Sequence, residues 1–197
     1  MKLRDFDSYK LSTVFDSAGY GSHGALIRLR INFGRRHIAD LEWLKDVYQV
    51  YFVYLKAFLR QQEDKWNVFT GFFTAFELAC IDELYPLDDK HKSVSGVPEI
   101  LKTAQIGPQV AFRRMKINYR RQMVAAMDWM KDLFPDEYEN SVLELESSEQ
   151  MWVRLTESLS VEVLRAVDDL YPLVHPEPMT KDKARQMIID QNLLEIN

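Results

Sequence analysis

Cysteine is almost missing from this chain of 197 residues, which contains only Cys80. A single thiol excludes an intramolecular disulfide framework and a zinc site built from several thiolates. Long apolar runs are missing too, since residues 47–59 include Gln49 and Lys56 and are too few to span a bilayer. The opening MKLRDFD leads into no apolar signal segment. We therefore expect a cytoplasmic protein that does not use a membrane.

Motifs that accompany catalysis are also missing. The sequence has no phosphate loop, no nucleophile elbow and no paired-glycine fingerprint. The histidines show no metal-ligand spacing with one another or with carboxylates; they are His23, His37, His91 and His175. We therefore predict a protein that is not an enzyme, with no catalytic residue, cofactor, metal site or small-molecule substrate.

Acidic residues are missing from two windows of an otherwise acidic chain. Residues 17–39 and 100–127 have charges of about +4 and about +6, whereas the whole chain has a net charge of −5. A positively charged region on an otherwise negatively charged protein is typical of proteins that bind phosphate groups. The charge pattern thus favours a nucleic-acid partner.

An internal repeat organises the sequence. Residues 25–48 match residues 111–134 without a gap, and Trp43 and Trp129 lie 86 positions apart. The same offset relates the run Leu-Tyr-Pro-Leu at residues 84–87 to its second occurrence at residues 170–173. We predict a single domain over residues 1–197, with repeats at 25–87 (copy one) and 111–173 (copy two) and a helical tail at 174–197.

Local periodicity predicts a strand and then two helices in each copy. In residues 25–33 apolar side chains alternate with Arg28, Arg30 and Asn32, and a period of two indicates a half-buried strand. The period then becomes helical, which predicts helices over residues 36–59 and 67–84 with a polar turn at 61–65. The predicted fold class is mainly α with a short β-ribbon, built from two tandem strand-helix-helix repeats.

Copy two leaves a second interpretation open. Its predicted strand, which ends at Tyr119, also fits a helical stripe, and the alternative for copy two is one long helix with no strand. Downstream we predict helices over residues 120–133, 136–145 and 149–170, the last capped by Ser147 or Ser148. A final helix over residues 180–194 has Thr180 as its N-cap.

The exposed side of such a ribbon has the chemistry of base recognition. Arginine or lysine donates to guanine and asparagine bridges adenine in the major groove, and arginines at the helix starts suit phosphate. The predicted DNA-binding residues are Arg28, Arg30, Asn32, Arg35, Arg36, Arg114, Lys116, Asn118, Arg120 and Arg121.

This pattern resembles the ribbon-helix-helix family of bacterial regulators over residues 25–84 and, more weakly, 111–170. The segment IRLRINFGRRHIADLEWLKD also resembles AcaB-type regulators of conjugative plasmids. The resemblance implies that the strand reads bases, with Arg28, Arg30 and Asn32 as the readers, and that two subunits pair their strands. We expect a homodimeric transcription regulator that binds specific double-stranded DNA; the strands pair either within one chain or across the dimer.

The tryptophans and the repeated Tyr-Pro motif have a structural interpretation, and the DNA hypothesis has one rival. The four tryptophans and the repeated Tyr-Pro motif are expected to be structural, with the tyrosine packed and the proline ending a helix. The rival to the DNA hypothesis is an all-helical, non-enzymatic adaptor that binds protein or single-stranded nucleic acid. In that case the arginines lie on charged helix faces.

If the ribbon hypothesis is correct, Arg28→Ala, Arg30→Ala or Asn32→Ala abolishes site-specific DNA binding with little loss of folding. Binding of selected duplex DNA at matched salt measures this. Variants that bind as tightly as the parent contradict the ribbon.

Overall fold

The computed structural model describes residues 11, 14–89, 91–103 and 106–191, and every regular element within these residues is a helix. The fold class predicted above is therefore wrong in its β-ribbon, and the described fold is all-α. Copy one contains α2 (Tyr20–Leu41), α3 (Gln49–Phe69) and α4 (Ala75–Leu84). Copy two contains α6 (Gly107–Met127), α7 (Pro135–Thr156) and α8 (Val161–Leu170), so the segments that match in sequence have the same order of helices.

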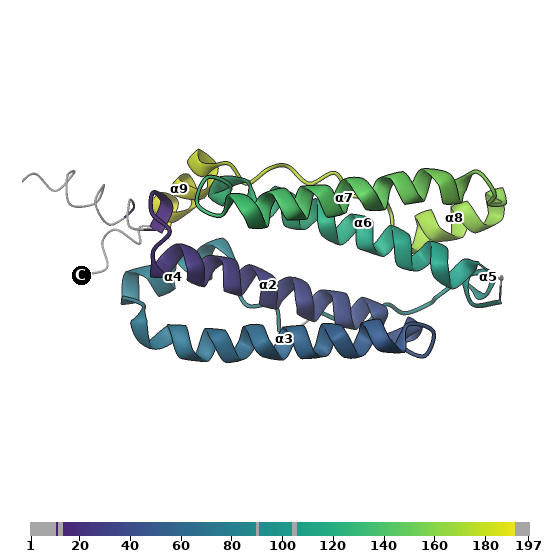
Figure 1. Ribbon diagram of the computed structural model, residues 1–197, viewed down its shortest axis with the longest axis horizontal. Coiled ribbons are helices and arrows are strands. Elements are labelled where there is room, and N and C mark those ends of the chain that lie inside the picture. Colours follow the sequence, from purple (N-terminus) through teal and green to yellow (C-terminus); the bar gives the residue numbers. More distant parts are fainter. Residues whose placement is uncertain (1–10, 12–13, 90, 104–105, 192–197) are drawn as a thin grey trace, which may run out of the picture.

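Short elements complete each copy. The 3-10 turns η1 (Glu42–Leu44) and η3 (Asp128–Met130) lie between the long helices, and η2 (Thr70–Phe72) follows α3. Helices α5 (Glu99–Thr103) and α9 (Lys181–Asp190) precede and follow copy two. Figure 1 shows the α2–α3 hairpin lying along the α6–α7 hairpin, with α4 and α8 at opposite ends of the molecule.

The predicted strands are helical because these segments are buried on nearly every side. In α2 the apolar Leu29 and Ile31 are buried, but so are Arg28 and Asn32 on the side that was expected to face solvent. A helix enclosed all round shows no amphipathic period, so alternation of residue types was not a sign of two faces. In copy two the helical alternative is correct, because α6 continues through the predicted strand.

Several predicted helix boundaries are wrong as well. The first helix does not continue to residue 59, because the chain turns at η1, and the predicted polar turn at 61–65 lies inside α3. Ser148 does not cap a helix; it is buried within α7 and donates to the carbonyl of Glu144 at 2.9 Å. The caps of α4 and α8 are Thr74 and Ser160, whose side-chain hydroxyls each accept a hydrogen bond from the backbone amide three residues later. The predicted cap Thr180 is confirmed.

Each of the two hydrophobic cores mixes both copies. One core combines Leu26 and Ile81 of copy one with Trp129 and Phe134 of copy two and Ile188 of α9. The other combines residues of the η1 turn and α3 with residues of α5, α6 and α8. Neither copy can therefore bury its own apolar surface without the other.

A pair of reciprocal hydrogen bonds joins the copies. The indole of Trp43 donates to the hydroxyl of Tyr171 at 2.8 Å, and the indole of Trp129 donates to the hydroxyl of Tyr85 at 2.7 Å. These tyrosines belong to the repeated Tyr-Pro motif, and both are buried directly after a helix end, as predicted. Because each tryptophan bonds the tyrosine of the other copy, the copies are related by an approximate twofold axis.

Each tyrosine hydroxyl also donates to a backbone carbonyl of the opposite copy. Tyr85 donates to Ala126 at 2.6 Å and Tyr171 to Asp40 at 3.2 Å, which are equivalent carbonyls at the ends of α6 and α2. The hydroxyl is thus an acceptor and a donor at once. Its removal leaves a buried indole N–H without its acceptor.

We expect Tyr85→Phe to lower the free energy of unfolding by about 1–3 kcal/mol, because the buried indole of Trp129 loses its acceptor. Urea unfolding followed by circular dichroism measures the change. The matched control is Tyr54→Phe, since the Tyr54 side chain is 61% exposed, and we expect a change within about 0.5 kcal/mol. Equal effects of the two substitutions contradict this role of the hydroxyl.

Candidate ligand pocket between the two copies

Eight of the ten residues predicted to bind DNA form ion pairs or hydrogen bonds within the chain. Arg28 is 7% exposed; it forms an ion pair with Asp82 at 3.0 Å, and its guanidinium lies 4.1 Å from the ring centre of Trp66. Copy two repeats both contacts with the equivalent residues: Arg114 with Asp168 at 2.7 Å and with the ring of Trp152 at 4.3 Å. The expectation that Arg28→Ala folds normally does not fit this buried position.

The two asparagines hold the chain that follows α4 and α8. Asn32 donates to the carbonyl of Pro86 at 2.9 Å and accepts from the amide of Asp88 at 3.0 Å. Asn118 makes the equivalent bonds with Pro172 and Val174. These amides bridge backbone groups in both copies, so their side chains do not face a groove.

Three of the arginines connect α2 or α6 to neighbouring segments through ion pairs. Arg35 pairs with Glu63 and Asp89, and Arg36 pairs with Asp88. Arg121 pairs with Glu149 at 2.6 Å and also donates to the carbonyl of Val174. The match between Arg35 and Arg121 thus reflects a shared internal contact, because their partners Glu63 and Glu149 are also 86 positions apart, whereas the equivalent of Arg36 is Gln122.

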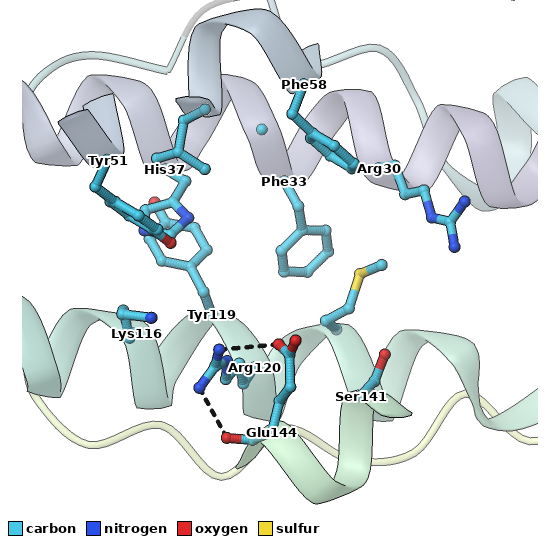
Figure 2. Close-up of a pocket in the computed structure, with 13 residues that line it drawn as sticks. Arg30, Phe33, His37, Tyr51, Phe58, Lys116, Tyr119, Arg120, Ser141 and Glu144 are labelled. Carbon is cyan, nitrogen blue, oxygen red and sulfur yellow. Dashed lines mark hydrogen bonds and ion pairs between the residues drawn. The ribbon is translucent and has the colours of Figure 1, made fainter. Parts of the chain in front are cut away.

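Three of the predicted residues, Arg30, Lys116 and Arg120, line one pocket of about 230 Å³ between the two hairpins. Figure 2 shows this pocket, with α2 and α3 on one side and α6 and α7 on the other. The other lining residues are Phe33, Gly34, His37, Tyr51, Leu55, Phe58, Tyr119, Met123, Ser141 and Glu144.

The pocket lies on the approximate twofold axis, because its lining consists of equivalent positions of the two copies. Twelve of its thirteen lining residues form six pairs at the 86-residue offset, and Tyr51 is the exception. The pairs are Arg30 with Lys116, Phe33 with Tyr119, Gly34 with Arg120, His37 with Met123, Leu55 with Ser141, and Phe58 with Glu144.

The α3 and α7 sides of the lining differ in polarity, whereas the pair His37 and Met123 on α2 and α6 differs in the opposite direction. The α3 side presents Leu55 and Phe58, and the equivalent α7 positions are Ser141 and Glu144. Both copies retain a cation at the pair Arg30/Lys116 and an aromatic ring at the pair Phe33/Tyr119. The pocket therefore has an apolar wall, a polar wall and two cations related by the axis.

Two of the pocket cations have no ion pair with any residue that the structure describes. Arg120 is paired with Glu144 at 2.9 Å, but neither Arg30 nor Lys116 has a carboxylate within bonding distance among the described residues. Burial lowers the pKa of Arg30, and the more distant negative charge of Glu137 opposes this shift. Burial, followed by the charges of Arg120 and Arg113, lowers the pKa of Lys116 to about 8.

His37 is one of the neutral polar groups of the pocket. Its ring stacks on Tyr119 with centroids 4.6 Å apart, and its Nε2 has no hydrogen-bond partner among the described residues. Burial, together with the charges of Lys116 and Arg120, lowers the pKa of His37 to about 3. His37 is therefore uncharged at physiological pH and adds no charge to the cations around it.

Two other classes of site are absent from the described residues. No group of three or more histidine, cysteine, aspartate or glutamate side chains is placed to hold a metal ion. Among the described helices, none is both long and apolar enough to cross a membrane. No protein-family model, curated protein or solved structure matches this chain.

Sequence reasoning identified three pocket residues but missed the rest of the lining. Tyr51 and Phe58 were placed in a helix by their periodicity, but nothing in the local pattern shows which face meets the other copy. One signal was available in the sequence. Between the copies the residue type changes from Arg30 to Lys116 and from Phe33 to Tyr119, but a cation and an aromatic ring are kept at these positions. Such pairs are consistent with a shared wall whose two sides have diverged.

We expect the parent protein to lose about 1–2 kcal/mol of stability between pH 7 and pH 5 relative to His37→Met. The unfolded chain binds a proton at His37 below about pH 6.5, whereas the folded chain does not, so stability falls as the pH falls. Methionine occupies the equivalent position of copy two. Denaturant unfolding of both proteins at the two pH values measures the difference, and an identical pH dependence contradicts a buried neutral imidazole.

Proposed function

We propose that this protein is a non-enzymatic helical binding protein that holds a small organic anion in the pocket between its two copies. The observation that carries the proposal is the pair Arg30 and Lys116. These equivalent cations line a pocket to which several aromatic rings contribute, and neither is paired with a carboxylate of the described residues.

An anion is favoured because unpaired cations are costly where water is partly excluded. A half-buried charge loses hydration, and this loss is offset only when an opposite charge or hydrogen-bond acceptor takes the place of water. Burial opposes the charged form of both side chains. A bound carboxylate or phosphate accepts from a guanidinium in a bidentate manner and from an ammonium as a point charge.

A compact apolar group on that anion is favoured by the walls and by the volume. The rings of Phe33, Tyr51, Phe58 and Tyr119 contribute to the lining. A volume of about 230 Å³ lies just below the range of pockets that take drug-sized molecules. Both features suit a ligand of the size of a phenyl carboxylate or phenyl phosphate.

This proposal keeps the helical, non-enzymatic character of the adaptor hypothesis and changes its partner. It also replaces duplex DNA as the partner, because most of the predicted base and phosphate contacts are engaged inside the chain. Three of the predicted cations converge on one compact pocket, which suits a small ligand better than an extended nucleic acid.

Calorimetric titration with phenyl phosphate and 3-phenyllactate tests the proposal, with neutral benzyl alcohol as the uncharged probe. We expect both anions to bind and benzyl alcohol to bind far more weakly. Arg30→Gln and Lys116→Gln each weaken anion binding about tenfold, since each removes one charge-assisted contact. The control Arg154→Gln removes the same charge from an exposed position of α7 outside the pocket and leaves the affinity unchanged.

The pH dependence provides a second measurement with a defined sign. Because the pKa of Lys116 is about 8, its charge is lost between pH 7 and pH 9, and anion affinity falls over that interval. In Lys116→Gln this decrease is absent. Binding of both anions with equal affinity to the parent and to the double variant Arg30→Gln/Lys116→Gln contradicts the pocket as their site. So does salt-dependent binding of an oligonucleotide that phenyl phosphate does not displace.

A further inference from the structure

Lys116 differs chemically from the other cations of the pocket because it is an amine. Its equivalent in copy one is Arg30, so the same position holds a guanidinium on one side of the axis and an ammonium on the other. A neutral lysine amine attacks carbonyl carbons, whereas an arginine remains protonated and does not. The difference between the copies thus places one nucleophile in the pocket.

The surroundings of Lys116 come from three helices. Its Nζ lies 5.0 Å from the ring centre of Tyr51 on α3 and 5.3 Å from that of Phe112 on α6. Arg113 and Arg120 on α6 oppose its positive charge, and Glu144 on α7 favours it. Figure 2 shows Lys116 projecting from α6 close to Arg120, whose guanidinium is already paired with Glu144.

In these surroundings a substantial fraction of the Lys116 side chain is uncharged near physiological pH. Burial is the largest cause that lowers the pKa of Lys116 to about 8, and the two arginines add to it. At pH 7.5 roughly a quarter of the side chain is then uncharged, compared with about a thousandth for an ordinary lysine. No described carboxylate is within ion-pair distance of the amine, so its lone pair is available once the proton leaves.

We propose that Lys116 forms an imine with the carbonyl group of the bound anion, so that the ligand class of the pocket is a small oxo acid with an apolar group. This inference rests on the proposed function, since the carboxylate must first be held by the guanidinium of Arg30, which has no carboxylate partner among the described residues. Arg30 lies across the axis and Arg120 one helical turn along α6, both lining the same pocket.

The chemical step is a condensation without oxidation or reduction. The Nζ lone pair attacks the carbonyl carbon, a C–N bond forms, and the carbonyl oxygen takes up a proton to give a carbinolamine. The C–O bond then breaks, and the oxygen leaves as water with both protons it has acquired, one of them originally on the nitrogen. The imine is protonated at nitrogen, so the positive charge that faces the carboxylate is retained.

Reductive trapping tests the inference. The parent protein is incubated with phenylpyruvate and sodium cyanoborohydride, digested and examined by mass spectrometry. We expect a reduced adduct on Lys116 in at least about tenfold excess over Lys56, an exposed lysine of α3 that also lies against an aromatic ring. Excess 3-phenyllactate, which has no ketone, suppresses the adduct on Lys116.

The variant Lys116→Arg separates the nucleophile from the charge. Arginine already occupies the equivalent position across the axis, and we expect this variant to form no adduct at position 116, because a guanidinium stays protonated and does not attack carbonyl carbons; titration with 3-phenyllactate measures its anion binding separately. The control Lys56→Arg retains the adduct on Lys116. With phenylpyruvate at a saturating concentration, the yield at Lys116 rises between pH 7 and pH 9 in the parent, because more of the amine is neutral.

The outcomes distinguish the two proposals. If 3-phenyllactate and phenylpyruvate bind but Lys116 carries no adduct, the imine is excluded and the anion pocket remains. If neither compound binds, the proposed function fails and the imine fails with it. Equal adduct on Lys116 and Lys56, or adduct that excess 3-phenyllactate does not reduce, identifies non-specific reaction and overturns the inference.

Discussion

Two tryptophans and two tyrosines connect the halves of this protein through hydrogen bonds that cross between its copies. Trp43 bonds Tyr171 and Trp129 bonds Tyr85, and each tyrosine hydroxyl also bonds a carbonyl at the end of the opposite long helix. A buried indole N–H without an acceptor is costly, so these bonds constrain the angle at which the copies meet. The mixed cores and the position of the pocket depend on that angle.

The pocket is a consequence of duplication within one chain. In a homodimer the residues on the two sides of a twofold axis are identical, because both subunits have the same sequence. Here the two sides are encoded separately, so Phe58 can face Glu144 across the axis and Arg30 can face Lys116. Fusion of the copies therefore permits an asymmetric site at a position where a symmetric dimer has only a symmetric one.

The arginines show why a sequence window of one charge is a weak guide to a binding surface. The window at residues 17–39 contains no carboxylate, but the partners of Arg35 are Glu63 and Asp89, 28 and 54 positions away. Arg28 and Asn32 likewise find their partners on or just after α4. Agreement between the copies at these positions reflects a fold that both copies must satisfy. Residues that match between the copies therefore indicate a shared structure as much as a shared function.

Local interactions determined much of the architecture from sequence alone. The 86-residue offset, the helix ends before the Tyr-Pro motif and the cap at Thr180 all depend on residues close together in the chain. Tertiary structure decided that residues 25–33 are helical, since enclosure by both copies removes the amphipathic period on which such predictions rest. It also decided which cations remain unpaired, because ion pairs join residues that are distant in sequence, and only the folded chain shows that Arg30 and Lys116 have none among the described residues.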